Sequence, residues 1–440
     1  MSQNPAAVVL AGGLGTRMKS HVPKHFHRLL GRRMVDWVVE SAREVGAQPL
    51  VVVTSEQGAA ELDGLTVAVQ AEPRGTGDAL AAARGALDGV SGDLFVLSGD
   101  APAVSPEVLR SLLATHRNEH AAATILSFRP ADPREYGRII RGEDGAVRAI
   151  VEAGDATPDE LAVGEVNSSI YVFDAARVWP ALDQIDTSNE QGELYLTDAV
   201  RVLVENGDRV AAYVAPDPTE AEGVNTRAEL AEAAAALRDR INTEHMLAGV
   251  TIVDPRTTWI EADVEIEADA TIHPFTVLSG KTKVAAGASV GPHAVAIDAT
   301  IGPDATVGPF CYLRPGTVLE ARAKAGTFVE IKNSHIGEGA KVPHLSYVGD
   351  TDVGEGTNIG AGGITANLPH GHDVAKQRTT IGRNVHTGVQ NVFVAPITVG
   401  DNAWIAAGSV VTKNVPPGAL AIARSRQVNK EGYDDRKRHD

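Results

Sequence analysis

The stretch IGPDAT-VGPFCY-LRPGTV-LEARAK-AGTFVE, residues 301–330, returns to an aliphatic or small residue at every sixth position. The same period occurs before it in IEADAT-IHPFTV (266–277), and after it in VGEGTN-IGAGGI (353–364) and VGDNAW-IAAGSV (399–410). Such a repeat is typical of a parallel β-helix, in which the aliphatic side chains point into a narrow prism and three repeats complete one coil. We therefore predict a left-handed parallel β-helix of hexapeptide repeats over residues 251–425.

One segment breaks this period. The stretch TANLPHGHDVAKQRTT (365–380) lacks the repeat, and we expect it to form a loop that projects from the prism. Loops inserted into a regular scaffold often carry a functional site. Cys311 falls inside a repeat, where a small buried residue is expected rather than a nucleophile. Residues 426–440 are rich in charge and are predicted to form a tail.

The N-terminal half follows a different pattern, in which apolar strands alternate with amphipathic helices. Strands are predicted at 6–12, 49–55, 65–71, 93–100, 122–128 and 167–174, and helices at 34–46 and 79–89. This alternation favours a doubly wound α/β domain over residues 1–225, with a mostly parallel, Rossmann-like sheet. Ligands of such sheets bind at the carboxyl ends of the strands. Residues 226–250, rich in Ala and charge, are predicted to form a linker helix.

Composition excludes several classes of protein. The formal net charge is −17, which argues against a broad surface for nucleic acid or for membranes. The chain contains one cysteine, so it cannot form an intrachain disulfide. No signal segment begins the sequence, and no apolar run approaches the ~20 residues that span a bilayer. We expect a cytoplasmic protein.

The glycine-rich stretch VVLAGGLGTRMKSHVPK (8–24) suits a phosphate ligand, because backbone N–H groups can approach phosphate closely after the first strand. Arg17 and Lys24 supply positive charge that this acidic chain otherwise lacks. Asp100, at the end of another strand, suits Mg²⁺. The stretch matches neither a Walker loop nor a clean dinucleotide fingerprint, so a structural turn with solvated Arg and Lys side chains is the alternative.

Further motifs follow in order along the whole chain. The N-terminal half contains QAEPRGTGDAL (70–80), YGRI (136–139), IVEAGDAT (150–157), GEVNSSIY (164–171), QGELYLTD (191–198) and EGVNTRAEL (222–230). The C-terminal half contains RPGT (314–317), GTFVEIKNS (326–334), KVPHLSYVGD (341–350) and NIGAGGITAN (358–367). Together with the opening stretch, this set resembles the bacterial bifunctional N-acetylglucosamine-1-phosphate uridyltransferase/glucosamine-1-phosphate N-acetyltransferases.

For the N-terminal half, the resemblance implies in-line attack by N-acetylglucosamine 1-phosphate on the α-phosphate of UTP, with release of pyrophosphate. Arg17 and Lys24 would be the catalytic cations, and Asp100 and Asn225 would ligate Mg²⁺. The nucleotide would be bound by Leu10, Ala11, Gly12, Gly13, Gln70, Gly75 and Thr76. The sugar phosphate would be bound by Gly137, Glu152, Asn167 and Asn225.

For the C-terminal half, the resemblance implies acetylation of glucosamine 1-phosphate by acetyl-CoA. His344 would be the general base, a role that suits an imidazole near neutral pH. The amino-sugar phosphate would be bound by Arg314, Lys332, Tyr347 and Asn358. Acetyl-CoA would be bound by Ala361, Asn367, Ala407 and Arg424.

The sequence departs from the family pattern around this second site. Leu368 and Val389 stand where the family usually has a Tyr and a Ser, and each lacks the corresponding hydroxyl group. The loop after Leu368 is longer than usual and carries His370 and His372, which we consider as substitutes for one lost contact.

Two other interpretations remain open from the sequence. The chain could be a sugar nucleotidyltransferase with a single activity, whose β-helix only assembles the oligomer. It could also be a catalytically silent scaffold or regulator with the same two domains. The resemblance implies a homotrimer, and nothing indicates a nucleic-acid partner or membrane insertion.

Overall fold

The computed structural model describes residues 4–13, 15–133, 135–189, 191–368 and 375–433. The chain divides into two compact units, Met1–Leu237 and Arg238–Asp440. The division falls within α8 (Arg227–Leu247), in the region where the sequence predicts a linker helix over residues 226–250. The predicted limits of the domains stay predictions.

The first unit is built on a mixed sheet. Its strands lie in the order β11 (Val210–Val214), β7 (Ala123–Phe128), β10 (Val166–Asp174), β6 (Asp93–Ser98), β1 (Ala6–Leu10), β4 (Leu50–Thr54) and β5 (Thr66–Val69). Within this order, β10 is antiparallel to both neighbours and the other pairs are parallel. The hairpin of β8 (Arg138–Arg141) and β9 (Val147–Val151) pairs with β10. The mostly parallel sheet predicted from the sequence is confirmed.

Helices cover both faces of this sheet, because successive side chains of each strand point to opposite sides. Ala6 and Val8 of β1 join one core, together with α3 (Thr76–Ala82), α6 (Ala175–Leu182) and α7 (Leu196–Glu205). Ala7 and Val9 join the other core, together with α1 (Met34–Glu44) and α4 (Pro106–Asn118). The unit is therefore doubly wound, as predicted.

Shorter elements complete the first unit. They are the strands β2 (Arg28–Leu29) and β3 (Arg32–Arg33), the helices α2 (Glu56–Ala59) and α5 (Pro158–Leu161), and 3-10 turns at Thr16–Met18, Lys24–Phe26, Arg84–Leu87 and Pro218–Glu220.

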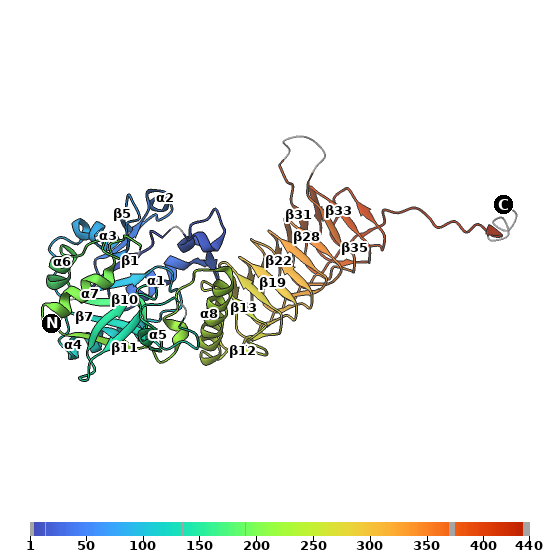
Figure 1. The fold of residues 1–440 in the computed structure, drawn as a ribbon. Helices are drawn as coiled ribbons and strands as arrows, with labels where there is room; N and C mark the ends of the chain where they lie inside the picture. The colour runs from blue at the N-terminus through green and yellow to red at the C-terminus, as the bar shows by residue number, and fades with distance from the viewer. Residues whose placement is uncertain (1–3, 14, 134, 190, 369–374, 434–440) are drawn as a thin grey trace. The chain divides into compact units, whose positions relative to one another are not determined.

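The second unit is a stack of short parallel strands in three faces (Figure 1). The first face contains β12 (Thr251–Ile252), β15 (Thr271–Ile272), β18 (Ser289–Val290), β21 (Thr306–Val307), β24 (Lys324–Thr327), β27 (Lys341–His344), β32 (His386–Thr387), β35 (Trp404–Ile405) and β37 (Leu420–Ala421). The second contains β13 (Trp259–Ile260), β16 (Val277–Ser279), β19 (Ala294–Ile297), β22 (Cys311–Leu313), β25 (Glu330–Lys332), β28 (Tyr347–Gly349), β30 (Ile364–Ala366), β33 (Val392–Val394) and β36 (Val410–Val411). The third contains β14 (Glu265–Ile266), β17 (Lys283–Val284), β20 (Thr300–Ile301), β23 (Val318–Leu319), β26 (His335–Ile336), β29 (Thr351–Val353), β31 (Thr379–Ile381) and β34 (Ile397–Val399).

The six-residue period explains this architecture. Ile301, Val307 and Leu313 open successive repeats, lie on three different faces and are fully buried. Burying one aliphatic side chain from each face on every coil gives the prism a continuous apolar core. The predicted left-handed β-helix is confirmed, and its regular coils carry the C-terminal candidate site.

Candidate active sites

In the first unit, the ammonium of Lys24 lies between the two residues predicted to hold Mg²⁺. Lys24 Nζ donates a hydrogen bond to Asn225 Oδ1 at 3.0 Å and forms an ion pair with Asp100. Ser98 Oγ donates to the other carboxylate oxygen of Asp100 at 2.6 Å. The oxygens of Asp100 and Asn225 thus converge on a position that already holds a cation. Two such oxygens fit Mg²⁺, which usually takes its other ligands from substrate phosphates and water.

Burial and the neighbouring charges have opposite effects on the pKa of Asp100. Burial alone would raise the pKa of Asp100, but the charges of Lys24 and His25, with hydrogen bonds from Lys24 and Ser98, lower it to about 2. Burial lowers the pKa of His25 to about 4, so its imidazole is neutral at physiological pH. Asp100 is therefore a permanent anion beside Lys24.

The glycine-rich loop packs directly against the same cluster. Gly15 has a φ of +61°, and a Cβ there would lie 2.5 Å from Lys24 Cβ. A Cβ on Gly12 would lie 2.9 Å from Gln70 Oε1. The absence of side chains therefore lets the loop approach both Lys24 and Gln70. Leu10 and Ala11 precede the loop at the end of β1, and Gly13 lies beside His25.

Gln70, Gly75 and Thr76 lie together at the end of β5. Gln70 Nε2 donates to Gly75 O at 3.1 Å and to Asp78 Oδ2 at 2.9 Å. Thr76 Oγ1 accepts from the backbone N–H of Leu196 at 3.0 Å, at the start of α7. The predicted nucleotide-binding residues therefore gather at one edge of the sheet.

Arg17 differs from Lys24 in its surroundings. Its guanidinium is exposed and pairs with Glu135 at 3.5 Å, whereas the Lys24 side chain is buried against Asp100. The structure thus brings Lys24 into direct contact with Asp100 and Asn225, whereas Arg17 pairs with Glu135 outside this cluster.

The predicted sugar-binding residues form a second cluster in the first unit. The backbone N–H of Asn167 donates to Gly137 O at 2.8 Å, and a Cβ on Gly137 would lie 3.3 Å from Glu152 Oε2. Burial raises the pKa of Glu152. The sequence interpretation missed two partners here, namely Thr197, whose hydroxyl donates to Glu152 at 3.1 Å, and Tyr171, which accepts from Asn167 at 2.8 Å.

In the second unit, three cationic side chains gather beside successive coils. Arg314 follows β22 and pairs with Glu330 at 2.8 Å, and Lys332 ends β25 on the next coil. Contact with Lys376, followed by the charges of Lys376 and Arg314, lowers the pKa of Lys332. The sequence interpretation missed Lys376, because it lies in the segment where the repeat gives no positional information. Such a concentration of positive charge suits an anion.

Tyr347, His344 and Asn358 belong to the neighbouring coils. Tyr347 pairs in register with Glu330 and Ile364, and it borders a hollow of about 480 Å³ lined also by Phe328. His344 ends β27 with its side chain exposed, and Ser346 Oγ donates to its carbonyl oxygen at 2.7 Å. Asn358 bridges Lys341 and His386 on the first face.

The residues predicted for acetyl-CoA occupy different environments. Ala361 O accepts from Gln390 N at 2.7 Å, the backbone of Ala407 packs under Gly388, and the Arg424 side chain passes Gly408. The Asn367 side chain is buried instead, and its Nδ2 donates to Gln377 O at 2.9 Å and to Asp350 O at 3.3 Å. It ties together the two ends of the interrupting loop.

Two departures from the family pattern fall within the described residues, and both lie at the surface. Leu368 and Val389 are both exposed. His370 and His372 lie outside the described residues.

Comparison with known proteins agrees with both halves. A family model described as a MobA-like NTP transferase domain matches residues 7–201. The bifunctional protein GlmU of Streptomyces avermitilis is 49% identical, over 98% of this chain and 94% of that protein. Those of Brevibacillus brevis (44%, over 97% of this chain and 96% of that protein) and Mycobacterium tuberculosis (45%, over 98% and 92%) are similar along the same length. Among the described residues, no helix is long and apolar enough to cross a membrane. The chain therefore belongs to the GlmU family of bifunctional uridyltransferase/acetyltransferases.

Proposed function

We propose that the residues described above carry out the two reactions of the family. The β-helix unit acetylates glucosamine 1-phosphate with acetyl-CoA, and the α/β unit transfers uridylyl from UTP to the resulting N-acetylglucosamine 1-phosphate. The observation that carries this proposal is the convergence of Asp100, Asn225 and Lys24 under the glycine-rich loop. It supplies a cation position beside a loop that can accept phosphate.

In uridylyl transfer, the backbone N–H groups of Gly12 and Gly13 face the phosphates of UTP, and Gln70 reads the base. Glu152 and Asn167 hold the amino sugar, so that its phosphate oxygen attacks the α-phosphate in line and pyrophosphate leaves. This reaction requires positioning and charge neutralisation more than a strong base.

Asp100 and Asn225 would hold Mg²⁺, which supplies charge neutralisation between the phosphates when bound. Lys24 lies at that position in the structure. On substrate binding its ammonium turns from the two oxygens toward the phosphates, where Arg17 joins it from the exposed side of the loop.

In acetyl transfer, Arg314, Lys332 and Lys376 bind the phosphate of glucosamine 1-phosphate, and Tyr347 and Asn358 hold the sugar. His344 takes a proton from the amino group of glucosamine 1-phosphate as the amino nitrogen attacks the thioester carbonyl of acetyl-CoA, and the CoA thiolate leaves. The backbone at Ala361 and Ala407, with Asn367 and Arg424, holds acetyl-CoA. The role of His344 is supported by the exposure of its side chain at the end of β27.

We also propose that the chain works as a cytoplasmic homotrimer. Phe275, Phe310, Phe328 and Leu345 are about half exposed or more, and they line one corner of the β-helix. Exposed apolar surface of this extent is typical of a protein interface. Leu345 directly follows His344, so a neighbouring copy would cover the acetyl-transfer site.

The test is to supply the purified chain with glucosamine 1-phosphate, acetyl-CoA, UTP and Mg²⁺ and to identify the products by mass. We expect UDP-N-acetylglucosamine, pyrophosphate and free CoA. Asp100→Ala should stop the reaction at N-acetylglucosamine 1-phosphate. His344→Ala should lower acetyl transfer by roughly 10²–10⁴-fold while uridylyl transfer to supplied N-acetylglucosamine 1-phosphate continues.

Other outcomes would favour the alternatives. Uridylyl transfer without any acetyl transfer would indicate a single-activity nucleotidyltransferase with a β-helix scaffold. In that case Leu368→Tyr and Val389→Ser, made singly, ask whether the two missing hydroxyl groups explain the loss. Failure to bind UTP in the presence of Mg²⁺ would indicate a silent scaffold.

A further inference from the structure

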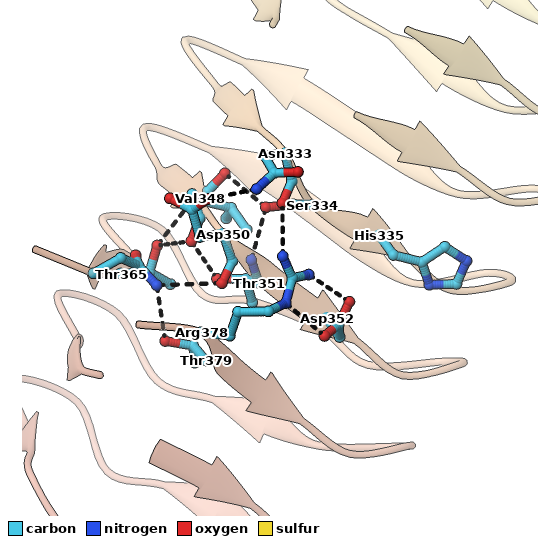
Figure 2. Close-up of polar contacts among 12 residues, drawn as sticks. Asn333, Ser334, His335, Val348, Asp350, Thr351, Asp352, Thr365, Arg378 and Thr379 are labelled. Carbon is cyan, nitrogen blue, oxygen red and sulfur yellow. Dashed lines mark hydrogen bonds and ion pairs between the residues drawn. The ribbon is translucent and has the colours of Figure 1, made fainter. Parts of the chain in front are cut away.

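Arg378 joins the end of the interrupting loop to two preceding coils. Its Nε and Nη2 donate to the two carboxylate oxygens of Asp352 at 3.1 and 2.7 Å, and its Nη1 donates to Asn333 O at 3.3 Å (Figure 2). Asp352 is the middle residue of β29, and Asn333 directly follows β25. A single guanidinium therefore spans three successive coils of the β-helix.

The residues that this guanidinium joins are close in sequence to both lysines of the cationic cluster. Asn333 is the residue after Lys332, and Arg378 lies two residues after Lys376. The backbone around them is also bonded, since Asp350 N donates to Lys332 O at 2.9 Å and Thr379 N donates to Asp350 O at 3.1 Å. The segments that carry Lys332 and Lys376 are thus fixed to one ladder.

Bringing the two ammonium groups together is unfavourable without an anion. Lys332 and Lys376 repel one another, and the charge of Arg314 adds to this repulsion. An exposed lysine at the end of a loop would ordinarily relieve the repulsion by moving into solvent. Asp352 neutralises Arg378, so the guanidinium connects the coils without adding its own charge to the repulsion between the lysines.

We propose that Arg378 is a positioning residue for acetyl transfer, which holds Lys376 beside Lys332 by pairing with Asp352 and Asn333. The two ammonium groups then form a preorganised site for the phosphate of the amino sugar. This inference rests on the acetyl transfer proposed above and assigns a role to a residue that does not touch substrate. Preorganisation lowers the cost of ordering the lysines when substrate binds.

The first test compares KM with kcat. Arg378→Ala should raise the KM for glucosamine 1-phosphate about tenfold, because a displaced Lys376 weakens the phosphate site. The kcat and the KM for acetyl-CoA should stay within about twofold, since His344 and the acetyl-CoA residues are unchanged. Asp352→Ala should reproduce the same split, and Asp352→Asn is the milder variant if folding is impaired. Uridylyl transfer by the other unit checks the amount of active protein, and an unchanged kcat for acetyl transfer shows that the β-helix of each variant is folded.

A double variant tests whether Arg378 acts through Lys376. If it does, Arg378→Ala combined with Lys376→Ala should have the same KM as Lys376→Ala alone. Multiplicative effects would mean that Arg378 contacts the phosphate independently, and they would overturn the positioning role. Arg383→Ala is the matched control, because Arg383 also pairs with an aspartate of a neighbouring coil, Asp401, at 3.1 Å and is likewise exposed. Its KM should not change.

Binding separates failure of this inference from failure of the proposed function. If the wild-type chain lacks acetyl transfer, the proposed function fails, and calorimetry with glucosamine 1-phosphate still compares the wild type with Arg378→Ala. A roughly tenfold weaker affinity in the variant supports the positioning role. Equal affinity in the two proteins, or an equal loss in Arg383→Ala, contradicts it.

Discussion

Lys24 and Arg17 show how two basic residues of one loop, equivalent in the sequence, acquire different physical roles. The Lys24 side chain is buried with Asp100, whereas that of Arg17 is 61% exposed. Lys24→Ala should therefore destabilise the first unit by about 3–5 kcal/mol, because it leaves a buried carboxylate without its partner. Arg17→Ala should change stability by less than about 0.5 kcal/mol. Both variants should lose uridylyl transfer by roughly 10²-fold or more.

Urea unfolding and a pyrophosphate-release assay separate these effects. Combining Lys24→Ala with Asp100→Asn should restore much of the stability, since the lone buried charge is removed, without restoring activity. Equal stability of Lys24→Ala and Arg17→Ala would show that the Lys24–Asp100 pair is not a buried pair in solution.

Glu152 is a buried carboxylate whose charge depends on pH. Burial raises the pKa of Glu152, so its ionised carboxylate destabilises the folded state at neutral pH. This loss of stability decreases as the pH falls through the raised pKa, and it is gone below the unfolded pKa of ~4.3. Glu152→Gln should therefore raise the unfolding midpoint at pH 7, and the advantage should shrink toward pH 4. Uridylyl transfer should fall by roughly 10²-fold. A Gln variant less stable than the wild type at pH 7 would contradict this account.

The residues missed by the sequence interpretation share a physical reason. Lys376 and Thr197 acquire their roles through contacts with Lys332 and Glu152, which lie far from them along the chain. The motifs show which residue types are present, and the resemblance to the family supplied most of their predicted roles. Neither the motifs nor the resemblance predicts that Lys24 occupies the cation position or that Asn367 supports a loop.

The hairpin of β8 and β9 depends on a buried carboxylate. Glu165 Oε1 accepts from Ser127 Oγ of β7 at 2.7 Å and from Arg141 Nη2 of β8 at 2.6 Å. Burial would raise the pKa of Glu165, but the hydrogen bonds from Arg141 and Ser127 lower it overall. Its contribution to stability is therefore present above the unfolded pKa and is lost as pH falls through the lower folded value.

Glu165→Gln should destabilise the first unit by about 3 kcal/mol at pH 7. The difference from the wild type should shrink below pH 4, where the wild-type carboxylate also becomes protonated. Urea unfolding at several pH values measures this. Glu119→Gln is the control, because Glu119 pairs with Arg209 at the surface and should change stability by at most about 1 kcal/mol. A gap that persists unchanged at low pH would show that packing, rather than charge, explains the loss.

The elements that the sequence predicts well are those in which every repeat must meet the same physical requirement. Every coil of the β-helix must bury aliphatic residues, so the requirement is visible at Ile301, Val307 and Leu313. The hairpin strand β8, Arg138–Arg141, begins and ends with charged residues, so its sequence does not resemble a strand. Its arginines are satisfied by partners such as Glu165 that only the folded chain provides.

An aromatic corner of the β-helix remains exposed in the folded chain. Phe310 stacks with His293 at 4.8 Å and with Phe328 at 5.3 Å between ring centroids, and all three adopt left-handed backbone conformations at the corner. The six-residue repeat did not predict this column, because it constrains only the residues that point inward. A column of rings that remains exposed after folding favours association with a second copy.

Phe328→Arg should therefore convert the proposed trimer to a monomer, because a charge within the column cannot be buried without a partner. Sedimentation velocity measures this change. Acetyl transfer should fall with the loss of the trimer, since the column runs beside Tyr347 and ends at Leu345, next to His344. Uridylyl transfer should persist, since its residues lie in the other unit. Asp304→Arg is the control, because Asp304 has the same left-handed conformation at a corner outside the column and is already charged. A Phe328→Arg protein that stays trimeric would exclude the column from the interface. One that becomes monomeric with full acetyl transfer would show that a single copy completes the site.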